Sequence, residues 1–159
     1  MNTRLQNGKE QIFCAWRHRW VRLTPEEWVR QQLLHRLVEQ LDYPASRIAV
    51  EVPVEKITNH QSPITNHQSP ITNHQSPITN HQRADAVVYD AALQPLMLIE
   101  CKAENVPLTQ KTLDQAITYN RKLNVPFLLL SNGAQTICVN GNNNQFTGLP
   151  RYADLLRRE

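Results

Sequence analysis

Short apolar runs separated by polar turns dominate the second half of the chain. One run, 96–99, follows Pro95 and ends at the charged pair Glu100 and Lys102, and another, 127–130, is apolar throughout. Runs of this length with turn residues at their ends are typical of buried strands rather than helices. The same reasoning applies where apolar and polar positions alternate. The pattern therefore predicts strands over 48–54, 83–89, 96–102, 125–130 and 135–139.

Two longer segments have helical spacing instead. The first starts at Thr24, which can cap the helix, with Pro25 in the first turn and Glu27 placed to complete a capping box. Its apolar positions predict a core-facing stripe, and Tyr43-Pro44 ends it. The second runs from about 109 to 123. A short terminal helix is expected over 152–158.

The order of these elements is helix, three strands, helix, two strands. This order predicts a single α/β domain over 1–159 with a central mixed sheet, in which the first strands are antiparallel. The second helix then acts as a crossover that leads to a parallel neighbour.

Candidate chemistry lies at the end of the strand over 96–102. Alternation places Glu100 and Lys102 on one side with Leu98, and Cys101 on the other with Ile99. A turn at 90–92 would bring Asp85 of the preceding strand beside Glu100. Two carboxylates can hold Mg²⁺, and a lysine can position or help to deprotonate an attacking water, so the set suits phosphodiester hydrolysis. An ordinary ion pair with an unrelated aspartate explains these three residues equally well.

The helix over 109–123 adds a further pattern. Gln115 and Tyr119 are four residues apart and share one helical face. A strand with Glu-x-Lys followed by a helix with Gln-x-x-x-Tyr resembles the RecB-like branch of the PD-(D/E)XK nucleases, which have a restriction-endonuclease-like core. With its flanks, the stretch from about 13 to 139, apart from one insertion, looks like the N-terminal nuclease domain of type I restriction enzyme R subunits in a small stand-alone form.

That resemblance assigns roles to residues. It implies that Asp85 and Glu100 bind Mg²⁺, or Mn²⁺ in its place, and that Lys102 acts on the water. Gln115 and Tyr119 would support the site or touch the DNA backbone. The expected function is an endonuclease in DNA restriction or defence, with DNA and other restriction-modification subunits as partners.

Other assignments remain open. Glu27 could supply a further acidic group near the metal, but its capping role is the stronger interpretation, and Glu51 is a weaker candidate for the cleft. A non-catalytic DNA-binding or restriction-associated module that retains the nuclease fold is the main alternative function. An interaction protein with no nucleic-acid role would leave the paired charges unexplained.

Composition narrows the setting. The formal net charge is +3, with basic residues concentrated towards both ends, which suits contacts with phosphates. Three widely spaced cysteines form neither a disulfide framework nor a zinc pattern, so a reducing cytoplasm is expected. No apolar run reaches the roughly 20 residues of a membrane helix, so no membrane role is expected. The chain has no phosphate-loop pattern, so we expect no ATP-driven translocation by it.

An internal repeat occupies 57–82. The heptapeptide Ile-Thr-Asn-His-Gln-Ser-Pro occurs three times and is followed by a truncated copy. Tandem copies of the heptanucleotide ATCACCA encode this peptide, so the segment looks like an expanded nucleotide repeat. A disordered or extended loop is the favoured interpretation, because each unit has one proline and a single apolar residue. Metal binding by the recurring histidines is a weaker alternative.

Overall fold

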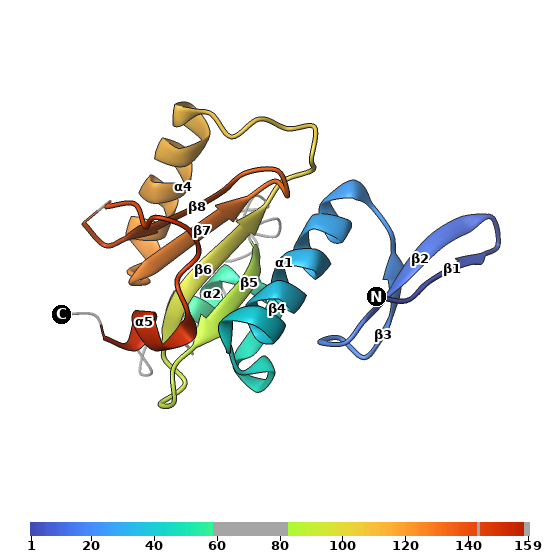
Figure 1. Cartoon of the computed structure of the whole chain (residues 1–159), viewed down its shortest axis with the longest axis horizontal. Helices are drawn as coiled ribbons and strands as arrows, with labels where there is room; N and C mark the ends of the chain where they lie inside the picture. The colour runs from blue at the N-terminus through green and yellow to red at the C-terminus, as the bar shows by residue number, and fades with distance from the viewer. Residues whose placement is uncertain (59–82, 143, 158–159) are drawn as a thin grey trace, which may run out of the picture.

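A computed structural model describes residues 1–58, 83–142 and 144–157 (Figure 1). Its strands form a three-stranded and a five-stranded sheet. The smaller sheet comprises β1 (Thr3–Gln6), β2 (Lys9–Cys14) and β3 (Arg19–Arg22). The larger comprises β4 (Ile48–Pro53), β5 (Arg83–Tyr89), β6 (Pro95–Cys101), β7 (Phe127–Ser131) and β8 (Thr136–Asn140). The helices are α1 (Pro25–Leu41), α2 (Val54–Thr58), α4 (Gln110–Leu123) and α5 (Tyr152–Leu156), with a 3₁₀ turn at Ala45–Arg47.

The larger sheet has the strand order β4-β5-β6-β7-β8. The pairs β4/β5, β5/β6 and β7/β8 are antiparallel, whereas β6 and β7 are parallel and are joined through α4. This is the expected mixed sheet with a crossover helix, and the α/β prediction is confirmed. A parallel pair needs such a connection because the chain must return to the same end of the sheet.

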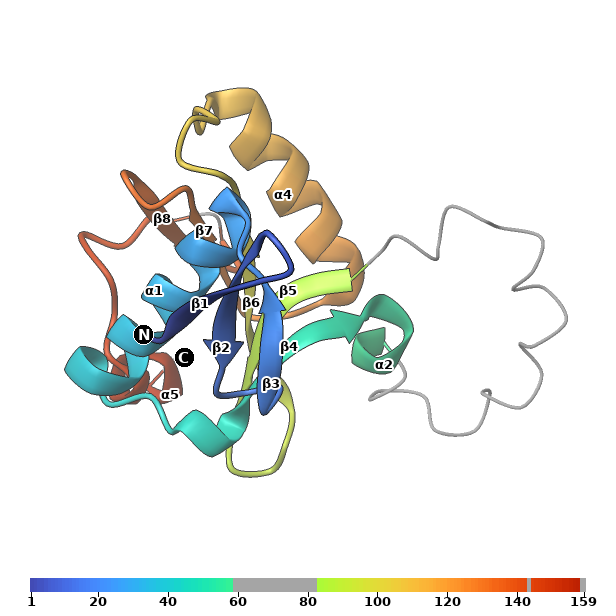
Figure 2. The ribbon, with the colours of Figure 1, turned by 90° about the vertical axis from the view of Figure 1, so that its right-hand side faces the viewer.

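Each face of this sheet has its own hydrophobic core. α1 and α5 pack on one face, which includes Met97 and Ile99, and α4 and α2 pack on the other, which includes Leu98 (Figures 1 and 2). Alternation along β6 therefore continues to its end: Cys101 belongs to the α1 side. The predicted alternation of side chains along β6 is confirmed, and it places Glu100 on the α4 side with Leu98.

Strand β4 departs from the predicted alternation. The sequence places Ile48, Val50 and Val52 on one face, but Val52 belongs to the α4 side, whereas Ile48 and Val50 pack on the α1 side. The cause is Glu51, whose φ of 53° lies in the left-handed region and which has no partner in the β4/β5 register. A residue in this conformation interrupts the pleat, so the strand changes faces there.

The N-terminal sheet β1–β3 was not anticipated from the sequence. Its strands are short, and β1 is exposed throughout, so the apolar pattern there is weak. It stands on the far side of α1 from the larger sheet (Figure 1). Ile12 and Cys14 are fully buried, so one of its faces is attached to the body of the protein.

The helix boundaries follow the predicted capping residues. Thr24 accepts a hydrogen bond from the Glu27 backbone N–H at 3.0 Å, and Thr109 caps α4.

Only two residues of the repeat are described. Ile57 and Thr58 lie in α2, and Ile57 is fully buried against the α4-side core. The expectation of a disordered or extended loop is therefore wrong at Ile57. The repeat from residue 59 to 82 lies outside the described residues. No helix in the described ranges is long and apolar enough to cross a membrane.

Candidate active site

A pocket of about 260 Å³ lies between α4 and the adjoining ends of the larger sheet. β6 contributes Glu100, Lys102 follows directly after it, and α4 contributes Gln115 and Tyr119, which lie one helical turn apart. The structure thus brings four of the five predicted site residues to the lining of one pocket. The remaining lining residues are Arg83, Thr112, Ala116 and Leu130. We call this the Glu100 pocket.

Asp85, the fifth predicted residue, lies directly behind the pocket on β5. Its carboxylate accepts a hydrogen bond from the Cys101 backbone N–H at 2.7 Å. Its side chain is also close enough to Glu100 for a hydrogen bond between the two carboxyl groups. The antiparallel pairing of β5 and β6 accounts for this. Ala86 lies opposite Ile99, so Asp85, which precedes Ala86, is next to Glu100, which follows Ile99. Asp85 and Glu100 therefore meet as predicted.

The two carboxyl groups perturb each other. Burial, followed by the charge of Asp85, raises the pKa of Glu100 to about 8. Burial also raises the pKa of Asp85, but the Cys101 N–H and the Arg30 guanidinium both favour its charged form. The two carboxyl groups therefore titrate as a coupled pair, in which the contacts that favour the charged form are made to Asp85.

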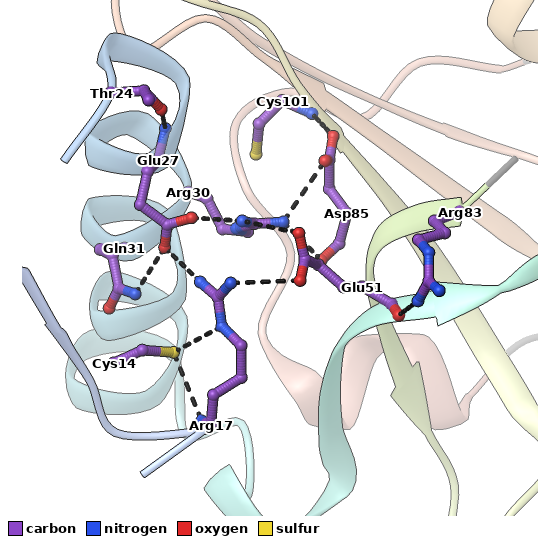
Figure 3. A network of polar contacts seen from close by, with 10 residues as sticks. All are labelled: Cys14, Arg17, Thr24, Glu27, Arg30, Gln31, Glu51, Arg83, Asp85 and Cys101. Atoms are coloured by element: carbon purple, nitrogen blue, oxygen red, sulfur yellow. Dashed lines mark hydrogen bonds and ion pairs between the residues drawn. The ribbon is translucent and has the colours of Figure 1, made fainter. Parts of the chain in front are cut away.

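A network of charges, with Glu27 and Arg30 buried at its centre, lies on the α1 side of Asp85 (Figure 3). Arg30 of α1 has its guanidinium 3.5 Å from an Asp85 carboxylate oxygen and 3.7 Å from a Glu51 oxygen. It also pairs with Glu27, which a second cation, Arg17, approaches to 2.6 Å. We call Arg17, Glu27, Arg30 and Glu51 the Arg30 network. It explains the unusual backbone of Glu51, whose carboxylate is turned towards the arginines (Figure 3).

Two of the weaker candidates have different roles from those expected. Glu27 does not complete the predicted capping box, because its carboxylate accepts hydrogen bonds from Arg17, Arg30 and Gln31 instead. Burial opposes its ionisation, but these bonds together lower the pKa of Glu27 below its ordinary value. Glu51 pairs with arginines rather than lining the Glu100 pocket. Both carboxylates are thus structural ion-pair partners.

The sequence reasoning did not single out Glu26, an exposed acidic residue in the first turn of α1. Burial, and then the charge of Asp85, raises the pKa of Glu26, whereas Lys102 lowers it. Glu26 is thus the acidic residue of α1 that lies near the predicted site, and its neighbour Glu27 faces the Arg30 network. Side chains one position apart in a helix point about 100° apart, so the choice depends on the rotation of α1 against the sheet.

Arg83 is a second residue that was overlooked. It lines the pocket and donates a hydrogen bond to the Glu51 carbonyl at 3.1 Å. The sequence could have indicated Arg83, because it lies two residues before Asp85 on the same strand, and residues two apart in a strand point to the same side. Across the pocket, burial and the charge of Glu100 raise the pKa of Tyr119. Cationic and phenolic groups therefore surround the acidic centre.

The donor set has a clear chemical preference. In the described part of the chain no three His, Cys, Asp or Glu side chains converge to form a ready three-ligand metal group. Two adjacent half-buried carboxyl groups nevertheless repel each other, and this repulsion contributes to the raised pKa of Glu100. Mg²⁺ is held in many sites by one or two carboxylates, with water and substrate phosphates completing its shell. Asp85 and Glu100 fit a hard divalent cation of this kind.

Comparison with known proteins places the chain in a family. The family model described as "Type I restriction enzyme R protein N terminus (HSDR_N)" matches residues 25–152. Among solved structures, the chain is similar to a fragment described as a candidate HsdR subunit of a type I restriction enzyme from Vibrio vulnificus YJ016, with 24% identity and a TM-score of 0.41. That match covers 48% of this chain and 15% of the other. The search of curated proteins found no match. The extent of the family match, over both α1 and the whole of the larger sheet, shows that the chain belongs to the type I restriction enzyme R protein N-terminus family.

Proposed function

We propose that this chain is a metal-dependent DNA endonuclease of the PD-(D/E)XK kind, with Mg²⁺ as its cofactor and Mn²⁺ as a substitute. The observation that supports the proposal most is the meeting of Asp85, Glu100 and Lys102 at one end of the sheet, beside Gln115 and Tyr119. The family match adds that R subunits of restriction enzymes are its context, so DNA is the expected substrate.

Each residue has a role that follows from its position. Asp85, whose carboxylate is contacted by Arg30 and the Cys101 N–H, and Glu100 would bind the cation. Bound metal would neutralise the charge that builds on the phosphate and lower the pKa of a bound water. Lys102 projects from the same side of β6 as Glu100 and would position the attacking water and stabilise the developing negative charge.

The surrounding groups would hold the substrate. Arg83 brings a guanidinium to the pocket, and Gln115 and Tyr119 bring uncharged hydrogen-bonding groups from α4. Arginine, amide and hydroxyl groups are common partners of phosphate oxygens and fix the register of the backbone without reading sequence. We therefore expect these three residues to contact the DNA backbone next to the cleaved bond.

A plasmid-cleavage assay tests the proposal. The wild-type chain should nick or linearise supercoiled DNA with Mg²⁺ or Mn²⁺ and not with EDTA. Asp85→Ala and Glu100→Ala should each abolish cleavage, because each removes a metal ligand. Glu39→Ala is the matched control, since Glu39 is an exposed acid of α1 outside the pocket. Equal cleavage by wild type and both site variants would overturn the assignment.

The same assay separates the main alternative. A restriction-associated module that retains the fold without catalysis would bind DNA but show no cleavage with either metal. Its Asp85→Ala and Glu100→Ala variants would then bind DNA at least as tightly as the wild type, because each substitution removes negative charge near the phosphates.

A further inference from the structure

The N-terminal sheet lies before residue 25, where the family match begins, so its role is not contained in that match. Its two faces can be separated from the strand register, because residues directly opposite each other share a face. Arg4 lies opposite Gln11, which lies opposite Arg22. Gln6 pairs with Lys9, and Phe13 with Trp20. These seven residues form what we call the outer face.

The other face carries the attachment to the body of the protein. Ile12 and Cys14, both fully buried, lie on it. The one acidic residue of the sheet, Glu10, is also on this side, opposite Leu5. The outer face therefore has three cations and no carboxylate, whereas one further cation, Arg19, lies on the other face, opposite Cys14.

The three cations of the outer face are free to meet an anion. Arg4, Lys9 and Arg22 are exposed, and within the described ranges none of them forms an ion pair. Arg4 and Arg22 flank Gln11 on neighbouring strands, so their backbones are about 10 Å apart. Like charges this close repel each other and favour a partner that is itself an extended polyanion.

The aromatic residues of the outer face argue against stacking with unpaired bases. Trp20 packs edge-on against Phe13, with ring centroids 5.6 Å apart. The Arg4 guanidinium covers the Trp20 ring, with its central carbon 4.2 Å from the centroid, and donates a hydrogen bond to Gln11 at 2.7 Å. A ring covered in this way orients a cation rather than serving as a platform for a base. The face therefore suits phosphates.

The outer face is also connected to the proposed active site. Arg22, the last residue of β3, is four residues before Glu26, the α1 acid that lies near Asp85 and Lys102. Four residues span at most about 14 Å of chain. The end of this face is therefore within about 14 Å of Glu26, the α1 acid nearest the proposed active site.

We propose that the outer face of the N-terminal sheet binds the phosphate backbone of duplex DNA and holds it next to the Glu100 pocket. This inference rests on the proposed nuclease function for the identity of the polyanion. Arg4, Lys9 and Arg22 supply contacts without sequence preference, and Gln6 and Gln11 supply hydrogen bonds to the same backbone.

Duplex binding tests this inference without requiring cleavage. Fluorescence anisotropy with a labelled short duplex in EDTA compares the full chain with the triple variant Arg4→Gln, Lys9→Gln, Arg22→Gln over a series of salt concentrations. If each cation neutralises one phosphate, the slope of log affinity against log salt should become shallower by about 2.7. At low salt the affinity should fall at least tenfold.

The matched control removes three charges elsewhere: Arg36→Gln, Arg121→Gln, Lys122→Gln, all exposed residues on α1 and α4. It should keep the wild-type slope. If the first triple variant fails to fold because Arg4 supports Trp20, the pair Lys9→Glu and Arg22→Glu tests the same face without disturbing that contact. An unchanged slope in the outer-face variants, or an equal loss in the control, overturns the inference.

Cleavage separates this inference from the proposed function. If wild type cleaves plasmid, the outer-face variant should show a raised KM with kcat nearly unchanged, because its chemistry is intact. Wild-type protein that binds duplex through the outer face but never cleaves would refute the nuclease proposal and leave this one standing. Cleavage with wild-type KM in the variant would do the reverse.

Discussion

Two clusters of charged residues meet at Asp85. One pairs opposite charges, and the other brings two carboxyl groups together. In the Arg30 network each buried carboxylate has a cation beside it, and hydrogen bonds lower the pKa of Glu27 despite burial. Behind the Glu100 pocket two carboxyl groups are neighbours, and the pKa of Glu100 rises to about 8. Pairing of opposite charges stabilises a fold, whereas adjacent like charges cost stability and mark a site that needs a ligand.

Asp85 forms the acidic pair with Glu100 and also contacts the Arg30 network through Arg30. Arg30 and the Cys101 N–H both contact its carboxylate and favour its charged form, although burial raises the pKa of Asp85. The Arg30 network thus orients Asp85, one member of the acidic pair. Glu51, which pairs with Arg30, has a left-handed backbone conformation. The comparison predicts that changes in the pocket alter activity more than stability, and that changes in the network do the opposite.

After the two metal-ligand variants, the largest effect on activity is expected from Lys102→Ala. Loss of a general acid or base typically costs about 10²- to 10⁴-fold in rate, so plasmid cleavage should fall by this factor. Mg²⁺ affinity, measured by calorimetry, should be unchanged or slightly tighter, because a positive charge near the carboxylates is removed. Lys122→Ala, at the exposed end of α4, is the control. Unimpaired cleavage in Lys102→Ala would contradict the role given to this residue.

Arg30→Met should produce the largest loss of stability. Removing one partner from a buried ion pair leaves other charges uncompensated and costs about 3–5 kcal/mol. Urea denaturation should show this loss, whereas Arg36→Met, an exposed position on the same helix, should stay within about 0.5 kcal/mol of wild type. A stable Arg30→Met protein would break the distinction between the two clusters.

Glu100→Gln should stabilise the fold in a pH-dependent way. Folding raises the pKa of Glu100 from 4.5 to about 8, so the folded state holds a proton that the unfolded chain has released. The free energy of unfolding of the wild type therefore decreases as pH rises from 4.5 towards 8. The variant lacks this decrease because its side chain does not ionise. At pH 8 the variant should be more stable by about 1–3 kcal/mol, and at pH 4.5 the two thermal melts should converge.

The exposed Glu39 provides the control for this effect. Glu39→Gln should follow the wild-type melting temperature across the same pH range. A difference between Glu100→Gln and wild type that does not depend on pH would show that the carboxyl pair is not the source of the effect.

The smallest effect is expected from shortening the repeat between β4 and β5. These strands carry Glu51 and Asp85, one from each cluster. If the repeat is a solvated insertion, deleting 64–77 should change stability by only about 0.6 kcal/mol, because loop-closure entropy depends weakly on length. Thermal melts and plasmid cleavage check this. A loss of several kcal/mol would show that the clusters depend on the repeat.

The sequence alone was sufficient for the five strands of the larger sheet and for the centre of the pocket, but not for the change of face in β4. Strand alternation assigned Glu100 and Lys102 to one side of β6, and helical spacing placed Gln115 and Tyr119 together, as the pocket lining confirms. The turn after β5 set Asp85 beside Glu100. These features depend on the periodicity of strands and helices and on short connections, both of which are visible in neighbouring residues of the sequence.

Other features were decided by the tertiary structure. Whether Glu26 or Glu27 lies near the predicted site depends on how α1 is rotated against the sheet, and the change of face at Glu51 depends on arginines from β2–β3 and α1. The N-terminal sheet has little apolar pattern, so its cationic outer face emerges only when three strands pair. In each case the partner is distant in the sequence, and packing selects among arrangements that local patterns leave equal.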